Sequence, residues 1–328
     1  MTRLRTAAVF ELNLETLARQ AQQITRQYFG RTISLYAPLY LANYCENQCL
    51  YCGFSARLHI KREKLAPEQI AAECAALAGT GIQSILLLTG ESHRHTPVSY
   101  LMEAVEIAKK HFPSISIEVQ PLETDEYRAF AEAGVDGMAV YQETYDQALY
   151  AQLHPAGRKR DFQYRFETPA RAAQAGIRHI SLGALLGLGD WRPDVEALFE
   201  HLGGLEREYP GVNFSLSFPR MQPVEGAIQP CIVSDDDMVR IICAARVLFP
   251  RMGINLSTRE LARFRDHVFP LGVTRMSAGS ATTVGGYAQS LLGNDAQFSV
   301  NDDRSLAEIK TMLISKQYDP VITDWRRM

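Results

Sequence analysis

Three cysteines within eight positions constrain this sequence more than any other feature. Cys45, Cys49 and Cys52 lie in the stretch L-A-N-Y-C-E-N-Q-C-L-Y-C-G-F-S, directly after a strand-like run over residues 33–42. Three thiolates this close repel one another unless a metal neutralises them. Structural zinc and a fully protein-ligated four-iron cluster each take four ligands. The missing fourth cysteine therefore favours a [4Fe–4S] cluster with one iron left open. The alternative is zinc with a histidine, such as His59, as its fourth ligand.

Composition indicates a globular protein with a large core. The chain has 328 residues, of which 46% are hydrophobic, and a formal net charge of −3. No overall basic charge points to nucleic acid, and the basic triplet at residues 158–160 is typical of a solvated loop. No apolar run approaches the ~20 residues of a membrane span, and residues 1–11 lack the apolar region of a secretion signal. With six cysteines, too few for a disulfide scaffold, we expect a cytoplasmic protein that does not bind membranes.

Strand and helix signals alternate eight times along the chain. Residues 1–30 are predicted as a helical lead-in, with an amphipathic helix over residues 12–29. Residues 31–328 are predicted as a single α/β domain, a (β/α)8 TIM-type barrel that ends in a helix over residues 303–315. A turn-rich connection, residues 219–233, is a candidate lid or surface loop. The eight predicted strands are residues 33–42, 84–89, 115–120, 136–142, 179–186, 213–218, 253–258 and 273–278.

Four of these strands alternate apolar and polar residues, whereas parallel strands buried on both faces normally run apolar. We expect the apolar residues to face the helices and the polar residues to line the barrel interior, where they would hold a ligand. The apolar sets are Leu35, Leu39 and Leu41; Ile115, Ile117 and Val119; Phe214, Leu216 and Phe218; and Ile254, Leu256 and Thr258. The polar sets are Tyr36, Pro38 and Tyr40; Ser116, Glu118 and Gln120; Asn213, Ser215 and Ser217; and Asn255, Ser257 and Arg259.

The predicted strand ends carry chemically active side chains, and barrel enzymes place their sites at this end. Each residue also has a simpler interpretation: a helix-start carboxylate, a solvated arginine or a tight-turn glycine. Together they favour a charged, amino-acid-like ligand. Cys74 and Cys243 fall on apolar helix faces and are predicted as core, while His93 and His95 are either surface residues or metal ligands. The ends supply the three cysteines, Glu91, Glu143, a glycine-rich run over residues 183–189, Arg220, Arg259 and Ser277.

The motifs resemble those of a known family. The spacing C-x3-C-x2-C, with an aromatic residue before the last cysteine, is the signature of the radical S-adenosylmethionine (radical SAM) enzymes. The runs L-L-L-T-G-E, E-V-Q-P-L, V-Y-Q-E-T-Y, S-F-P-R, L-S-T-R-E and S-A-G-S…G-G-Y follow in the order found in its aromatic amino-acid lyases. Over about residues 15–328 the chain is most similar to the thiamine-pathway tyrosine lyases.

The resemblance implies roles for individual residues. Cys45, Cys49 and Cys52 would ligate three irons, and S-adenosyl-L-methionine (SAM) would chelate the fourth. For SAM it implies Glu91 at the amino group, Glu143 at the ribose, Arg165 at the carboxylate, and Tyr51 and Leu185 at the adenine. For the substrate it implies Arg259 and Ser277 at the carboxylate, and Tyr40 at the amine.

The resemblance also implies a reaction and partners. Cleavage of the Cα–Cβ bond of L-tyrosine would give dehydroglycine and p-cresol for thiazole formation in thiamine biosynthesis. A flavodoxin or ferredoxin would supply electrons, and a thiazole synthase is a possible partner. The alternatives are a lyase of another aromatic amino acid such as tryptophan and, outside the class, a zinc-stabilised barrel that binds a small ligand. Because no cysteine follows Cys243, the second cluster of the related hydrogenase-maturation lyase is not expected.

Overall fold

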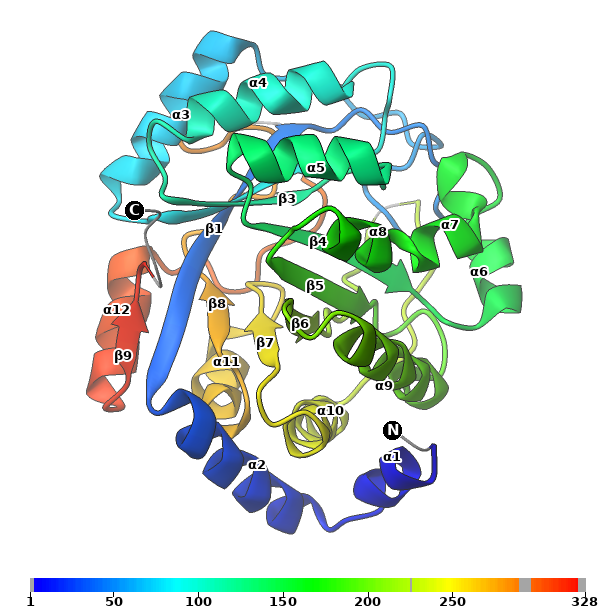
Figure 1. Cartoon of the computed structure of the whole chain (residues 1–328), viewed down its shortest axis with the longest axis vertical. Helices are drawn as coiled ribbons and strands as arrows, with labels where there is room; N and C mark the ends of the chain where they lie inside the picture. The colour runs from blue at the N-terminus through cyan, green and yellow to red at the C-terminus, as the bar shows by residue number, and fades with distance from the viewer. Residues whose placement is uncertain (1–2, 225, 289–295, 324–328) are drawn as a thin grey trace.

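Eight parallel strands close into a barrel because β1 bonds to both β2 and β8 in the computed structural model (Figure 1). The structure describes residues 3–224, 226–288 and 296–323. The predicted (β/α)8 architecture is confirmed, and the strand order around the ring is β2-β3-β4-β5-β6-β7-β8-β1. The strands are β1 (Thr32–Ala42), β2 (Ser84–Thr89), β3 (Ser114–Glu118), β4 (Gly137–Glu143), β5 (His179–Ala184), β6 (Asn213–Ser217), β7 (Gly253–Leu256) and β8 (Arg275–Ser277).

A ninth short strand, β9 (Asp319–Val321), pairs in parallel with the first residues of β1. The sequence did not predict this strand, because a three-residue segment is too short to show a periodic pattern. It follows the last helix, α12 (Leu306–Ser315), whose N-terminus is capped by Ser305.

Helices surround the barrel and cover the apolar faces of the strands (Figure 1). The two helices that precede β1 pack mainly against α10, and α2 buries Leu17, Ala21 and Thr25 there. The helices are α1 (Arg3–Phe10), α2 (Leu14–Phe29), α3 (Pro67–Gly79), α4 (Val98–Ala108), α5 (Thr124–Ala133), α6 (Gln147–Leu153), α7 (Phe162–Phe166), α8 (Thr168–Gln174), α9 (Trp191–Glu208), α10 (Asp235–Leu248) and α11 (Ala262–Val268).

The predicted alternation is clearest in β1. Leu35, Leu39 and Leu41 are fully buried in the core between barrel and helices, and Tyr36, Pro38 and Tyr40 line a cavity inside the barrel. The alternation holds only as far as each strand extends. Val119 and Thr258, predicted on the apolar faces, also line the cavity, because β3 ends at Glu118 and β7 ends at Leu256. The cavity wall therefore combines polar and apolar side chains.

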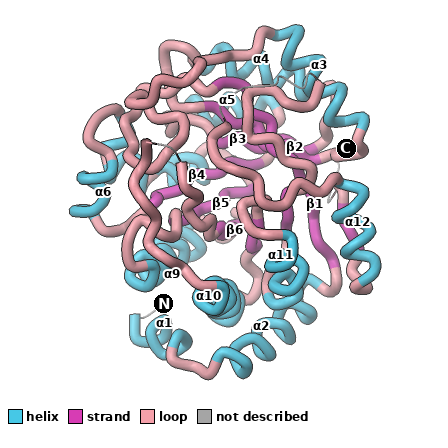
Figure 2. The backbone as a smooth tube through the Cα atoms, turned by 180° about the vertical axis from the view of Figure 1, so that it is seen from behind, coloured by secondary structure: helices cyan, strands magenta, loops and turns pink. Residues whose placement is uncertain are grey.

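Three long connections follow the C-terminal ends of strands and cover the cavity. They are residues 43–66 after β1 and the described parts of residues 218–234 after β6 and 278–305 after β8, and Figure 2 shows long loops gathered in front of the strands. The predicted lid or surface loop, residues 219–233, contributes Pro219, Met221, Gln222 and Val224 to the cavity wall.

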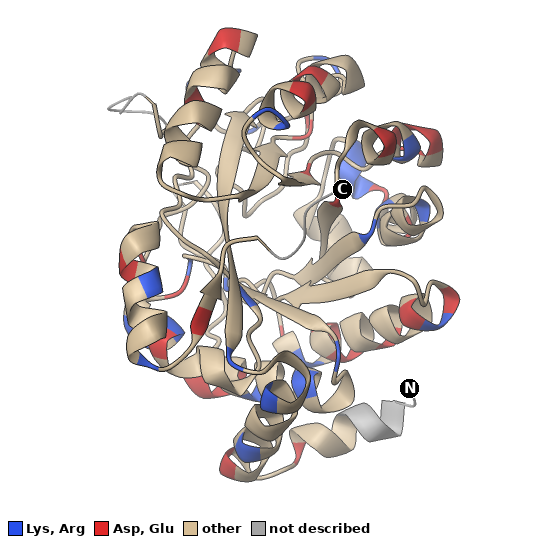
Figure 3. Ribbon diagram, turned by 60° about the vertical axis from the view of Figure 1, so that its left-hand side comes forward, with Lys and Arg blue, Asp and Glu red and all other residues tan. Residues whose placement is uncertain are grey.

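Charged residues of both signs are interspersed along the outer helices (Figure 3). In the part of the chain that the structure describes, no helix combines the length and apolar character needed to cross a bilayer.

Candidate active site

One cavity among the strand ends is lined by every residue to which the family resemblance assigns a role. The residues come from six of the eight strands, β1, β2, β4, β5, β7 and β8, or from the segments that follow them, so the fold brings them together. The shared cavity is a fact of the structure, while the individual roles stay predictions. The predicted residues in its wall are Tyr40, Cys45, Cys49, Tyr51, Cys52, Glu91, Glu143, Arg165, Leu185, Arg259 and Ser277.

The cysteine loop is held against the end of β2 by close backbone packing. A Cβ atom on Gly90 would lie 2.3 Å from the carbonyl oxygen of Tyr44, so only glycine fits at this point of the T-G-E run. The backbone N–H of Glu46 donates to the carbonyl of Glu91 at 2.9 Å, and Gly90 N–H donates to Ala42. This packing fixes Cys45 beside Glu91.

The three thiols share one electrostatic environment. Burial raises the pKa of Cys45 to about 11 and also raises the pKa values of Cys49 and Cys52. Charges on neighbouring site residues shift all three pKa values further. Charge on Cys52 raises the pKa values of both other thiols. Three thiolates can therefore coexist here only with positive charge from a bound metal group.

Among the described residues, the cavity supplies three cysteine ligands and no histidine as a fourth. No histidine lines the cavity, and His59, the fourth ligand of the zinc alternative, is exposed outside it. The three sulfurs do not converge on one ion position in this part of the chain. A four-iron cluster needs no such convergence, because each thiolate binds a separate iron. Cys74 and Cys243 are buried in the helix-side core, as predicted.

Glu91 is oriented by two donors. Arg165 Nη1 donates to Glu91 Oε1 at 2.8 Å, and Asn47 Nδ2 donates to Glu91 Oε2 at 2.8 Å. Burial alone would raise the pKa of Glu91, but the positive charges of Arg165 and Lys159 outweigh burial and lower that pKa. The carboxylate is therefore ionised and can bind a cationic group.

Glu143 stands at the end of β4 in the left-handed backbone region, with φ +72°, next to an irregularity in the strand pairing. Such a conformation is costly for a residue with a side chain and is typical of functional sites. Lys159 Nζ lies 2.6 Å from Glu143 Oε1, and both side chains are about 10% exposed. Burial raises the pKa of Glu143, but Lys159 and Arg165 bring that pKa below its ordinary value.

Lys159 corrects the sequence interpretation of the basic triplet. The flanking Arg158 and Arg160 are exposed, as expected for a solvated loop, but Lys159 turns inward to the cavity. The backbone N–H of Lys159 donates to Asn47 Oδ1 at 2.9 Å, which ties the triplet to the cysteine loop. Lys159 and Asn47 are thus site residues that the sequence did not single out, because both depend on contacts between distant segments.

An apolar wall lies next to the cysteines. Tyr51, Leu185 and Met221 pack together with Cys49. The Tyr51 hydroxyl lies 2.8 Å from His154 Nε2, and His154 Nδ1 lies 2.8 Å from the Tyr150 carbonyl. A carbonyl can only accept, so Nδ1 carries the proton. Burial lowers the pKa of His154 to about 3, so the neutral ring accepts from Tyr51 and fixes its orientation.

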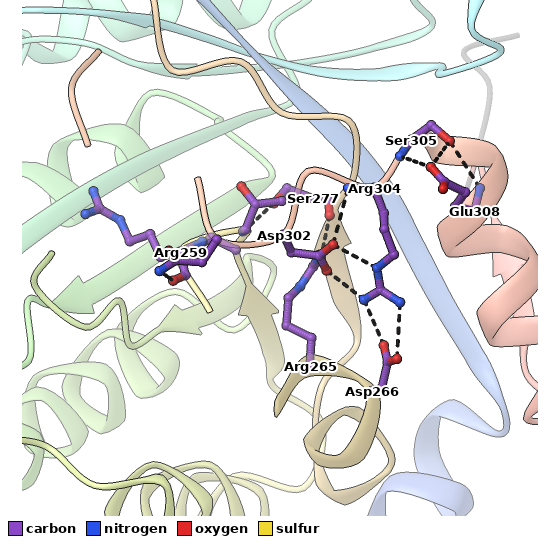
Figure 4. Close-up of polar contacts among 11 residues, drawn as sticks. Arg259, Arg265, Asp266, Ser277, Asp302, Arg304, Ser305 and Glu308 are labelled. Atoms are coloured by element: carbon purple, nitrogen blue, oxygen red, sulfur yellow. Dashed lines mark hydrogen bonds and ion pairs between the residues drawn. The ribbon is translucent and has the colours of Figure 1, made fainter. Parts of the chain in front are cut away.

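Arg259 brings a positive charge to the cavity wall and has no ion-pair partner in the described part of the chain. Its guanidinium stacks on the Phe298 ring at 3.3 Å and has no carboxylate partner among the described residues. Figure 4 shows the Arg259 side chain pointing away from the ion pairs that Asp302 forms with Arg265 and Arg304. Ser277 Oγ accepts from the Thr258 backbone N–H at 3.1 Å, and Tyr40 donates to Gln297 at 2.6 Å. Arg259 is therefore ready to bind an anionic group.

A buried charge network supports this side of the cavity (Figure 4). Arg265 and Asp302 form an ion pair with both side chains fully buried, and Arg304 joins Asp302 to Asp266. Arg265 also donates to the Ser277 carbonyl at 2.5 Å. Asn301 extends the support, since its side chain donates to the Arg259 carbonyl at 2.6 Å.

We expect Asp302→Asn to destabilise the protein by about 3 kcal/mol, because the Arg265 charge would remain buried without its partner. Thermal unfolding should shift down by several degrees. Glu308→Gln, at the exposed end of α12, is the control and should move the transition far less. An unchanged transition in Asp302→Asn would show that the network adds nothing to stability.

Arg220, one of the strand-end residues, does not line the cavity. Its guanidinium pairs with Glu260 and with Asp235 instead. The histidines of the H-x-H run are likewise engaged elsewhere: His95 bonds to Ser92, and His93 lies by Arg158.

Comparison with known proteins places the chain in a family. The Radical SAM superfamily model matches residues 39–202, and the Biotin and Thiamin Synthesis associated domain model matches residues 217–319. The chain belongs to the radical SAM superfamily. The 2-iminoacetate synthases of Salmonella typhimurium and Escherichia coli are 44% and 45% identical to it over 314 residues, which is 95% of this chain and 83% of each relative.

A solved structure agrees with this placement. The FeFe-hydrogenase maturase HydG from Carboxydothermus hydrogenoformans is 32% identical, with a TM-score of 0.90 over 98% of this chain and 76% of that protein.

The cofactors of this radical SAM protein are a [4Fe–4S] cluster and SAM. The described residues fit both groups. The cavity offers three thiols without a fourth protein ligand, beside an ionised carboxylate and an apolar wall. Thr89 and Ser280 also line the cavity, and their hydroxyls are buried without a hydrogen-bond partner among the described residues. Buried polar groups are normally paired, so these two indicate a place for a polar ligand.

Proposed function

We propose that this protein is a radical SAM tyrosine lyase that cleaves the Cα–Cβ bond of L-tyrosine to dehydroglycine (2-iminoacetate) and p-cresol. The observation that carries the proposal is 44–45% identity to two 2-iminoacetate synthases over 95% of the chain. The protein is thus a carbon–carbon lyase, and its product would serve thiazole formation in thiamine biosynthesis. When bound, the reduced cluster and SAM supply a 5′-deoxyadenosyl radical that takes a hydrogen atom from the substrate.

The site residues divide into a SAM half and a substrate half. Cys45, Cys49 and Cys52 would ligate the cluster. In the SAM half, Glu91 would accept from the amino group, since its carboxylate is ionised and fixed by Arg165 and Asn47. The other proposed SAM contacts are Glu143 at the ribose, Arg165 at the carboxylate, and the apolar wall of Tyr51 and Leu185 at the adenine.

In the substrate half, Arg259 would hold the tyrosine carboxylate with Ser277, and Tyr40 would approach the amine. Arg259 suits this role because a guanidinium pairs with a planar carboxylate through two parallel bonds. It is also already oriented by Phe298 and by the backbone contact from Asn301. The protein's part is then to orient the substrate and exclude water.

A low-potential electron donor such as flavodoxin or ferredoxin, and a thiazole synthase that consumes dehydroglycine, are the proposed partners. We also propose a reducing compartment, the cytoplasm, because all six cysteines are free.

The substrate assignment is tested by anaerobic incubation with SAM, dithionite and each aromatic amino acid in turn. We expect tyrosine to give p-cresol, together with glyoxylate from hydrolysis of dehydroglycine. Phenylalanine should be poorer by ~10⁴ or more if the site bonds the phenol hydroxyl. An indole product from tryptophan, with nothing from tyrosine, would instead favour the alternative of a tryptophan lyase.

A further inference from the structure

A third carboxylate faces the cavity, and no assigned role uses it. Glu118 is the last residue of β3, on its polar face. The other two cavity carboxylates are committed, because Glu91 pairs with Arg165 and Glu143 pairs with Lys159. Among the described residues Glu118 has neither an ion-pair nor a hydrogen-bond partner. Glu118 is half-buried, and an ionised carboxylate held on a cavity wall without a partner points to a ligand group.

Glu118 lies deeper in the barrel than the cysteine loop. It pairs in register with Leu88 of β2, and Leu88 pairs with Tyr40 of β1. These positions precede the end of β1 at Ala42, after which the cysteine loop begins. Arg259 lines the same cavity, and its charge acts on Glu118. A substrate whose carboxylate lies at Arg259 can therefore extend its side chain across the cavity toward Glu118.

The surroundings of Glu118 suit a phenol. Its charge raises the pKa values of Tyr36, Tyr40 and Tyr141, which places it among three tyrosine rings of the cavity wall. The charged groups that act on Glu118 itself are Glu143, Arg259, Lys159 and Arg165. Burial, followed by the charge of Glu143, raises the pKa of Glu118 to about 7. A base with a pKa near neutrality can both take and return a proton.

We propose that Glu118 accepts the hydrogen bond from the substrate's phenol hydroxyl and takes its proton as the Cα–Cβ bond breaks. This assignment rests on the proposed function. It also supplies the specificity for tyrosine, because phenylalanine would leave Glu118 without a partner.

The step balances once one hydrogen atom has left the substrate. Breaking the Cα–Cβ bond forms the C=N bond of dehydroglycine and leaves the odd electron on the side-chain fragment. With the phenol proton on Glu118, that fragment leaves as a radical anion. Conversion to p-cresol then takes one electron from a low-potential iron–sulfur or flavin donor and two protons. Glu118 returns one of these protons to the oxygen, and solvent supplies the other.

The test uses Glu118→Gln, which keeps the side-chain volume and an acceptor oxygen but cannot take a proton. We expect p-cresol formation to fall about 100-fold, with tyrosine affinity changed less than tenfold. Wild-type kcat/KM should rise with pH through about 7, as Glu118 ionises, and the variant should lack this rise. Ser116→Ala, on the same face of β3 but outside the cavity wall, is the control and should behave as wild type.

Two substrate analogues separate a proton acceptor from a merely structural residue. Fluorinated tyrosines have more acidic phenols, so they should restore much of the rate lost in Glu118→Gln. In a second assay, without turnover, 3-nitrotyrosine is bound to the SAM-loaded enzyme and its visible phenolate absorbance is recorded. A nearby negative charge raises a phenol's pKa, so the phenolate absorbance should be greater in Glu118→Gln than in wild type.

The outcomes also separate this assignment from the proposed function. A wild-type protein that forms no p-cresol from tyrosine would contradict the function itself. If the wild type is active, a Glu118→Gln variant of equal activity would overturn the role of Glu118 alone. The role of Glu118 would also be overturned if Glu118→Gln lost the same fraction of activity with tyrosine and with fluorotyrosine and left the nitrotyrosine spectrum unchanged.

Discussion

Cys49→Ala is expected to abolish SAM cleavage. The three thiols in this cavity have no fourth protein ligand among the described residues, so losing one leaves two thiolates to hold the cluster. The same result is expected for Cys45→Ala and Cys52→Ala. The measurement is 5′-deoxyadenosine formed by anaerobically reconstituted protein with dithionite, together with its iron and sulfide content.

Cys74→Ala and Cys243→Ala are the matched controls. Both cysteines are fully buried in the helix-side core, and neither lines the cavity. Each substitution removes one sulfur atom from a packed site, so we expect a modest loss of stability and SAM cleavage close to wild type. Full cleavage by Cys49→Ala, or none by either control, would show that the assignment of the ligands is wrong.

Arg259→Ala is expected to weaken tyrosine binding by about 4 kcal/mol, roughly 1,000-fold, because a buried carboxylate would lose its charged partner. SAM binding should change little, since the proposed SAM contacts lie on other strands. Calorimetry without oxygen, on SAM-loaded protein titrated with tyrosine, measures the effect.

Arg263→Ala removes an exposed arginine four positions further along the chain and should leave both affinities unchanged. Tyrosine affinity equal to wild type in Arg259→Ala would remove Arg259 from the substrate site. A parallel loss of SAM affinity would mean that it acts on the whole cavity rather than on the substrate.

The barrel could be predicted from sequence because its elements are periodic and local. The alternation in β1 placed Leu39 toward the helices and Tyr40 in the cavity, as the structure shows. The site residues could be predicted because strand ends meet at one end of such a barrel. Short or non-periodic elements such as β9 gave no usable signal.

Pairings between distant segments could not be predicted. The sequence R-K-R does not show that Lys159 turns toward Glu143 while its neighbours remain in solvent, because that depends on how the loop packs on Asn47. Likewise, a polar residue at the end of β3 was expected in the interior. That Glu118 has no partner among the described residues depends on the positions of Arg165 and Lys159, which pair with Glu91 and Glu143.

The central claim is that this protein breaks the Cα–Cβ bond of tyrosine, and isotope tracing tests it most directly. Reconstituted enzyme is incubated without oxygen with SAM, dithionite and tyrosine carrying ¹³C at Cα only. The account predicts that the label appears in glyoxylate, from dehydroglycine, and that p-cresol carries none. Label in an aromatic product, or 5′-deoxyadenosine formed from SAM while tyrosine is recovered intact, would contradict it.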